Sequence, residues 1–248
     1  MTATSTRSRM LLIGGGIVAA LAVVATLVVV FVLGDAPQEV DLDAAVAAAD
    51  DATEDATTTP VDPQGTWSVD TDAQPYSFDE STGTFVGFRI DEELSGIGAT
   101  TAVGRTPVVS GSVTLDAASL SAASFTADLS ELTTDDSRRD NRAKDALNVD
   151  AEPLTTFTLS APVDLGAEPQ PADTVTATAV GELTVNGVTQ QVEVPLEAAL
   201  STSGLLVVTG SLDVTLADFE VSAPSAPIVL GVSDVATIEI QLYLTKAA

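Results

Sequence analysis

The sequence predicts an all-β fold, either an antiparallel barrel or an antiparallel sandwich, from residue 67 onward. Short segments in which apolar and polar residues alternate recur through this region, and Gly, Asn, Asp and Ser separate them. No long segment of helical periodicity lies between them that could connect parallel strands. About eight such strands in succession are typical of a barrel or sandwich.

An uninterrupted apolar run over residues 10–33 precedes this region. About 20 apolar residues in a helix cross the hydrocarbon core of a bilayer. A cleaved signal peptide is the alternative, but its apolar region has only about 7–15 residues. We therefore expect an uncleaved transmembrane signal anchor. Arg7 and Arg9 precede the run, so we expect a cytoplasmic tail over residues 1–9 and an extracytoplasmic domain on a single-pass protein of the cell membrane.

Residues 34–65 are rich in Asp, Ala, Thr, Glu and Pro and contain no aromatic residue. Segments of this composition bury too little apolar surface to fold, and their charges repel one another. We expect a disordered acidic tether here, followed by a folded domain over residues 66–248. Residues 40–52, VDLDAAVAAADDA, could nucleate a short helix, but they offer little apolar surface for burial.

The alternation places the strands in chain order. The clearest segments are residues 109–116, 125–130, 156–160, 175–179, 192–198, 212–216 and 238–244. Asn186-Gly187 predicts a tight hairpin, because both residues tolerate the positive φ of a type I′ turn. Ser203-Gly204 predicts a second turn. Residues 135–148 are the one helical candidate, a short insertion between strands that Asp135 or Asp136 can cap.

Composition excludes several functional classes. The chain has 36 acidic and 9 basic residues, and this surplus of negative charge argues against binding nucleic acid. It has no Cys and no His, which removes disulfides, Cys-His and Ser-His-Asp nucleophiles and the usual ligands of zinc, copper and haem. We expect no enzymatic activity, no catalytic residues, no metal and no cofactor.

Six ordered segments resemble the YceI-like family. They read WSVDTD, FVGFRI, GSVTLD, DDSRRDNRAKDAL, EPLTTFTL and GELTVNGVTQQVEVPLEA, and together they cover roughly residues 65–246. The segment EELSGIGATTAVGRT is similar to membrane-anchored actinobacterial members. The resemblance implies an exported, lipocalin-like antiparallel barrel of eight strands that binds polyisoprenoid lipids. Family members commonly carry histidine near the positions of Asn141 and Asn186, where this chain has none.

The resemblance favours a ligand cavity in the barrel lumen over a solid core, an alternative that the residue pattern alone leaves open. The cavity would take a long-chain isoprenoid or a similar apolar lipid, by burial of the tail. The lumen candidates are Trp67, Phe85, Phe88, Phe125, Ala127, Phe157, Ala177 and Phe219.

Positive charge outside the anchor gathers in the helical candidate. Arg138, Arg139 and Arg142 could bind a phosphate or pyrophosphate headgroup, or they could pair with the aspartates around them. Arg89 and Arg105 are isolated, and we expect each to have a carboxylate partner.

The alternative function is an interaction module of the cell envelope with a filled barrel. The apolar loops at residues 92–104 and 223–234 would then bind the partner. The sequence identifies no protein partner.

Overall fold

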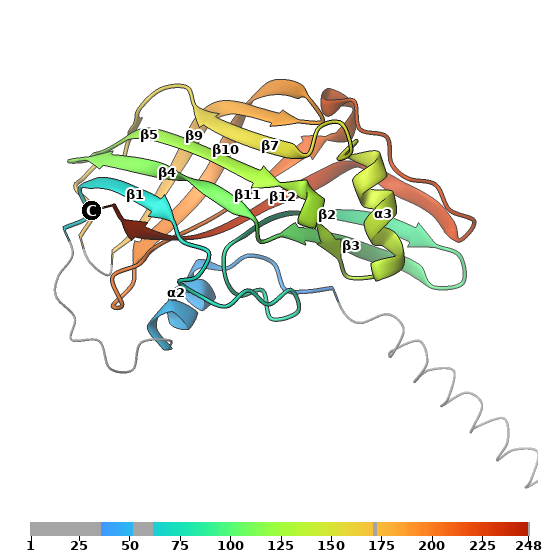
Figure 1. The fold of residues 1–248 in the computed structure, drawn as a ribbon, viewed down its shortest axis with the longest axis horizontal. Coiled ribbons are helices and arrows are strands. Elements are labelled where there is room, and N and C mark those ends of the chain that lie inside the picture. The colour runs from blue at the N-terminus through green and yellow to red at the C-terminus, as the bar shows by residue number, and fades with distance from the viewer. Residues whose placement is uncertain (1–35, 52–61, 171–172, 248) are drawn as a thin grey trace, which may run out of the picture. The chain divides into compact units, whose positions relative to one another are not determined.

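The computed structural model describes residues 36–51, 62–170 and 173–247 (Figure 1). The predicted anchor, residues 10–33, lies outside the described residues. In the described ranges, no helix has the length and hydropathy needed to cross a bilayer. The chain divides into two units, Met1–Ala36 and Pro37–Ala248, and the second unit contains the sheet.

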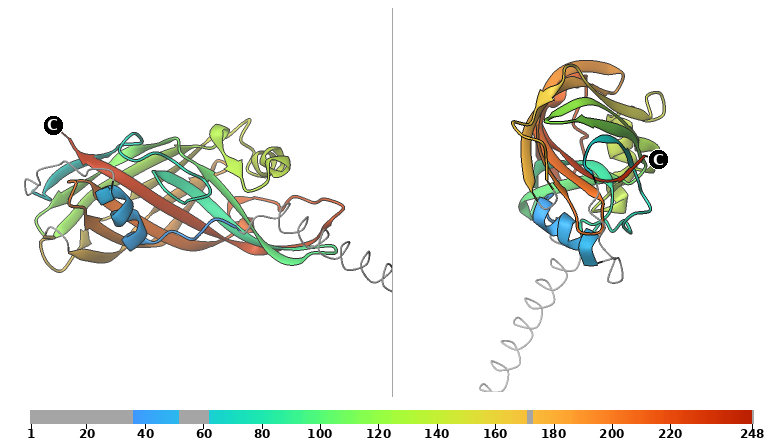
Figure 2. Two further views of the ribbon diagram at one scale, coloured as in Figure 1. Left: turned by 90° about the horizontal axis from the view of Figure 1, so that it is seen from below. Right: turned by 90° about the vertical axis from the view of Figure 1, so that its left-hand side faces the viewer.

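The second unit contains a closed antiparallel barrel, which confirms the barrel and excludes the sandwich. The ring closes because β1 pairs with both β4 and β12, and its end-on outline is visible in Figure 2. Its eight strands are, in order around the ring, β1 (Gly65–Val69), β4 (Val109–Asp116), β5 (Ser119–Asp128), β7 (Leu154–Leu159), β9 (Thr174–Val185), β10 (Val188–Leu200), β11 (Leu206–Thr215) and β12 (Val229–Lys246).

Further strands extend the wall toward one end. β12 pairs with β1 near its C-terminus and with β2 (Phe85–Leu94) over its earlier part. β2 then pairs with β3 (Gly98–Thr106), β3 with β6 (Thr133–Thr134), and β8 (Val163–Asp164) with β5. The 3-10 turns η1 (Leu129–Glu131) and η2 (Leu216–Phe219) follow β5 and β11. The wall therefore continues through β2 and β3 where β1 has ended.

The predicted turns and helix are confirmed. Asn186 and Gly187 connect β9 to β10 with φ of 51° and 72°, as a type I′ turn requires. Helix α3 (Ser137–Ala146) begins after Asp136, whose side chain accepts a hydrogen bond from the Arg138 backbone N–H. It lies at the end of the barrel where β2 and β3 extend the wall, opposite the end that holds the C-terminus (Figure 1). We call these the α3 end and the C-terminal end.

Side chains of β12 alternate between the two faces of the wall. Leu242 and Leu244 belong to the main core inside the barrel, together with Trp67 of β1. Tyr243 points to the outer face, where it belongs to a second apolar cluster. The alternation therefore gives the barrel an inner core and a separate buried patch on its outside.

The prediction of a disordered tether over residues 34–65 is wrong for its first part. Helix α2 (Leu42–Asp51) packs Leu42, Ala45 and Ala49 against the outside of the wall, formed there by β10, β11 and β12 (Figure 2). The Tyr243 hydroxyl donates a hydrogen bond to the Ala45 carbonyl at 2.9 Å. Small side chains let the helix approach closely, and the apolar partner surface belongs to distant strands. Residues 52–61 lie outside the described residues.

Residues 37–41, which we call the strap, precede α2 and lie on the same outer face. Arg105 donates hydrogen bonds to the Gln38 carbonyl at 2.8 Å and to Glu239 at 2.9 Å. Arg89 donates to the same carboxylate at 2.6 Å and to the Pro37 carbonyl. Arg89 and Arg105 thus have the carboxylate partner expected of them, and Glu239 is that partner for both.

Burial makes this cluster sensitive to the loss of one charge. The side chains of Arg105 and Glu239 are 0% and 1% exposed. The Arg105 guanidinium also stacks on the Phe85 ring, 4.2 Å from its centre. Removing one partner of a buried ion pair leaves an uncompensated buried charge, which costs more than the pair contributes.

We expect Glu239→Gln to lower the free energy of unfolding by about 3–5 kcal/mol, because it leaves two buried guanidinium groups without a carboxylate. Denaturant unfolding of the full chain measures this. The matched control is Glu193→Gln on β10, an exposed carboxylate, which we expect to change stability by less than about 0.5 kcal/mol. Equal effects of the two variants would contradict the role assigned to Glu239.

Candidate functional site

The inner wall of the barrel is mostly apolar, and its side chains are not equally buried. At the C-terminal end, Trp67, Leu115 and Leu244 are buried in the interior. Toward the α3 end, inward side chains of four strands are only half-buried. These are Val86 and Phe88 of β2, Phe157 of β7, Leu196 of β10, and Ile238 and Ile240 of β12. Val86, Leu196 and Ile240 pack against the main core, and Val194, Ala179 and Leu212 are buried among them. The inner wall toward the α3 end is therefore a mixture of buried and half-buried apolar side chains.

Three phenylalanine rings of the inner wall lie against glycines of the neighbouring strand. A Cβ placed on Gly104 would come within 2.5 Å of the Phe88 ring, and one on Gly181 within 2.4 Å of the Phe157 ring. A Cβ on Gly111 would come within 2.7 Å of the Phe125 ring. Each ring occupies the space that a side chain on the next strand would otherwise fill. The rings of Phe88 and Phe157 therefore lie against the backbone of the next strand.

The structure places most lumen candidates on the inner wall. Phe88, Phe125, Phe157 and Ala177 face inward and are half-buried. Trp67 and Ala127 also face inward, but both are buried in the main core. Trp67 lies at the C-terminal end, where its indole N–H donates a hydrogen bond to the Pro63 carbonyl at 2.8 Å.

Two lumen candidates do not lie on the inner wall. Phe85 is on the outer face of β2, beneath Arg105 and edge-on to Tyr76. It is three residues from Phe88, and an odd spacing in a strand places two side chains on opposite faces. Phe219 lies on η2, outside the strands, and its carbonyl accepts a hydrogen bond from Asn186.

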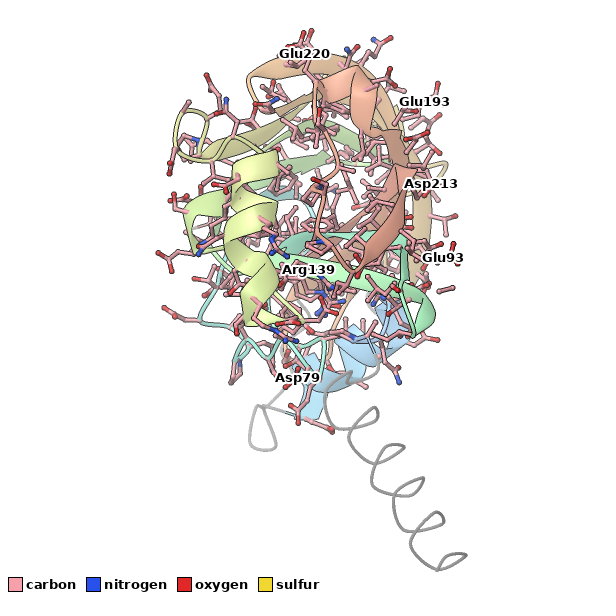
Figure 3. All side chains as sticks on the ribbon, turned by 90° about the vertical axis from the view of Figure 1, so that its right-hand side faces the viewer. Asp79, Glu93, Arg139, Glu193, Asp213 and Glu220 are labelled. Carbon is pink, nitrogen blue, oxygen red and sulfur yellow. The ribbon has the colours of Figure 1, made fainter. Side chains whose placement is uncertain are left out.

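A charged cluster stands at the α3 end of the inner wall. Arg139 of α3 donates to Glu92 of β2 at 2.5 Å and to Asp135 at 2.7 Å. In Figure 3, which looks along the barrel from this end, Arg139 is on the side of α3 that faces the barrel. Glu92 continues the inward positions Phe88 and Ile90 of its strand and is buried. Its ion pair fixes α3 over this end of the wall.

Burial raises the pKa of the Glu92 carboxyl above its ordinary value of 4.5, against the opposing effect of Arg139. Glu92 is the residue of this charged cluster that sequence reasoning missed. The signal was present in the strand FVGFRIDEEL, where an acid occupies the phase of the inward residues.

The other two headgroup candidates face solvent. Arg138 is exposed and pairs with Asp136 at 2.7 Å, and the hydrogen bond from Arg138 lowers the pKa of Asp136. Arg142 is exposed and forms no hydrogen bond or ion pair within the part of the chain that the structure describes. The three arginines therefore differ: one is engaged with the wall, one is paired at the surface and one has no partner there.

Metal-ligating side chains do not gather anywhere in the described ranges. Over residues 36–51, 62–170 and 173–247, no group of three or more Asp or Glu side chains is arranged to hold an ion. The chemistry available at the α3 end is therefore ion pairing and hydrogen bonding beside an apolar wall.

Comparison with solved structures finds similar bacterial proteins, and the first of them shares the fold. A polyisoprenoid binding domain from Saccharophagus degradans has 17% identity and a TM-score of 0.54, covering 73% of this chain and 98% of its own. BcnA of Burkholderia cenocepacia has 21% identity and a TM-score of 0.48, covering 64% and 95%. The YceI protein of Campylobacter jejuni has 19% identity and a TM-score of 0.48, covering 58% and 85%. Comparison with curated proteins gives no match.

The sequence profile of the YceI-like domain gives the decisive match. It covers residues 76–244, from the loop before β2 to a position near the C-terminal end of β12. This range includes the half-buried inner wall, α3 and the Glu92–Arg139 pair. It extends over most of the chain, and the chain therefore belongs to the YceI-like family.

Proposed function

We propose that this protein binds and carries a long-chain isoprenoid or a similar apolar lipid inside the barrel, without catalysing a reaction. The observation that carries the proposal is the inner wall toward the α3 end. Its apolar side chains include half-buried ones, and the rings of Phe88 and Phe157 lie against glycines of the neighbouring strands. An apolar tail gains about 0.8 kcal/mol for each methylene-sized group removed from water. A wall of this kind suits a long tail better than a compact polar ligand.

The family narrows the ligand class. The Saccharophagus degradans neighbour is described as a polyisoprenoid binding domain, and its likeness to this chain concerns the fold. Membership in the same family makes isoprenoid lipids the first class to test. The chemistry of the wall agrees with them, since it offers apolar contact and few polar partners.

The arginines of α3 supply the headgroup contacts in this proposal. Arg138 and Arg142 are exposed and suit a phosphate or pyrophosphate group. Arg139 is held by Glu92 and Asp135, so its part is to position α3 rather than to bind the headgroup directly.

We also propose that the barrel works outside the cytoplasm, attached to the cell membrane through residues 10–33 as in the membrane-anchored members of the family. The support is the length and purity of the apolar run and the placement of Arg7 and Arg9 before it. A bilayer is where a lipid of this class resides, so attachment keeps the barrel near its ligand.

A side chain added to the inner wall should compete with the ligand. We expect the purified full chain to retain about one apolar lipid per barrel, counted by solvent extraction and mass spectrometry. We expect Ala177→Phe to lose most of it, because Ala177 faces inward from β9. The matched control is Thr178→Phe, the next residue on the same strand, which is exposed and faces outward.

Circular dichroism establishes that both variants fold. Ala198→Phe on β10, another inward and half-buried position, replaces Ala177→Phe if that variant does not fold. Lipid retained by both inward variants, or absent from the unmodified chain, would contradict lipid carriage and favour an envelope interaction module with a filled barrel.

The raised pKa of Glu92 predicts a pH-dependent contribution to stability. A carboxyl with a raised pKa binds its proton more tightly in the folded state, so its contribution falls as the pH rises from 4.5 through the raised pKa. We expect the free energy of unfolding of the chain, relative to Glu92→Gln, to decrease over this interval and to level off above it. Urea unfolding at a series of pH values measures the difference. An increase with pH would mean that Arg139 outweighs burial.

A further inference from the structure

Two segments without charged residues meet at the α3 end of the barrel, one at the β2–β3 turn and one at the start of β12. Residues 94–104 and residues 221–233 each lack Asp, Glu, Lys and Arg, in a chain that has 36 acidic residues. Leu94 pairs with Val229, and the backbone N–H next to Leu94 donates to the Ile228 carbonyl at 2.7 Å. The fold therefore joins two uncharged segments that are more than a hundred residues apart in sequence.

Three large apolar side chains of these segments face solvent. Ile97 is 46% exposed, Ile228 55% and Leu230 64%. Single exposed apolar residues are ordinary, but these three all lie within three residues of the Leu94–Val229 pair. We call them the apolar rim. A rim of this kind at one end of a barrel indicates a contact surface.

The contacts of the strap extend along β12 toward the same end. Tyr243 donates a hydrogen bond to α2, and Glu239 accepts one from the Val40 backbone N–H. The Pro37 carbonyl accepts one from Arg89, which lies opposite Thr237 of β12. From α2 back to Pro37, the corresponding position on β12 therefore shifts from residue 243 to 239 and then to 237, toward the start of β12 at the rim. The first residue of the strap, Pro37, therefore contacts β2 at a position nearer to the rim than the contact of α2 with β12.

The length of chain before the strap limits its distance from the apolar run. Only residues 34–36 separate residues 10–33 from Pro37, so at most about 14 Å separates Leu33 from Pro37. Along β2, the rim begins about 17 Å from Arg89, five residues away, whereas the far end of β12 is nine residues or about 30 Å from Thr237. Pro37 is therefore nearer to the rim than to the C-terminal end of β12.

We propose that the apolar rim inserts into the interface of the bilayer, so that the α3 end of the barrel opens toward the membrane. The proposal rests on the membrane attachment put forward above and adds the orientation of the barrel to it. Apolar side chains at a bilayer surface are buried about 5–10 Å into the boundary between headgroups and acyl chains. In this orientation a lipid passes between bilayer and barrel without crossing water.

Charges of both signs lie around the rim. Glu93 of β2 and Asp213 of β11 are exposed on the outer surface at this end (Figure 3), and so are Arg138 and Arg142 of α3. The acids repel anionic headgroups and the arginines attract them, so a zwitterionic bilayer isolates the contribution of the apolar residues. Phosphatidylcholine is therefore the lipid for the test.

Fluorescence quenching tests the orientation in the full chain. The sequence has no Cys, so Ser95→Cys, an exposed position beside the rim, takes a single environment-sensitive NBD label. In phosphatidylcholine nanodiscs containing lipid with a quencher on the upper acyl chain, we expect this label to lose about half its emission, as burial at the interface implies. The matched control is Asp116→Cys in the β4–β5 hairpin at the opposite end, which we expect to lose none.

The rim residues themselves are tested in the same background. Ile97→Ser, Ile228→Ser and Leu230→Ser, combined with Ser95→Cys, should bring quenching down to the level of the Asp116→Cys control. Leu230→Ser alone serves if the combined variant does not fold. A label on Ser95→Cys that stays unquenched, or that is quenched equally with and without the rim residues, would overturn the proposal.

The same samples separate this proposal from the proposed function. If the chain retains apolar lipid while its rim stays in water, only the proposed insertion of the rim is overturned. A rim buried in the bilayer with no lipid in the barrel supports the rim and overturns lipid carriage. Protection of the label in cell membranes, with none in nanodiscs of the purified chain, would assign the rim to a protein partner and overturn insertion.

Discussion

Strand β12 makes the contacts on which the rest of the structure depends. Over 18 residues it pairs with β11 along one edge and with β2 and then β1 along the other. Its inward side chains belong to the core, while Glu239 and Tyr243 on its outward face hold the strap and α2. Because successive side chains point to opposite faces, closing the barrel and fixing the preceding segment do not compete for the same residues.

Local pattern was sufficient to predict the β-rich part of the fold. The alternation located the strands, and Asn186-Gly187 identified its hairpin. Asp135 or Asp136 was expected to cap the helix, and Asp136 caps α3. Local pattern failed at α2, because the apolar stripe of that helix is narrow and consists mostly of alanine. Its partner surface on β10, β11 and β12 lies at least 148 residues further along the chain, and no local signal in either segment indicates that they meet.

The residues of the candidate site could be predicted only where the alternation within a strand determines which face a side chain occupies. Phe88 and Phe157 are on the inner wall, but Phe85 was assigned by residue type and not by its position in the alternation. Arg89 and Arg105 were expected to have carboxylate partners, whereas the identity of Glu239 depends on the pairing of β2, β3 and β12. A chain with so many acids offers too many candidate partners for sequence reasoning to choose one.

The contact between the strap and β12 also sets the order of folding in time. Val40 and Glu239 are 199 positions apart, and the first and last strands of the ring are partners. During synthesis from the N-terminus, the strap and α2 emerge early and have no surface to pack on until the final strand is complete. Contacts of such separation form slowly, and apolar groups stay uncovered meanwhile. Ring closure and docking of the strap therefore both await the last strand, and a chain that stops short of β12 has neither.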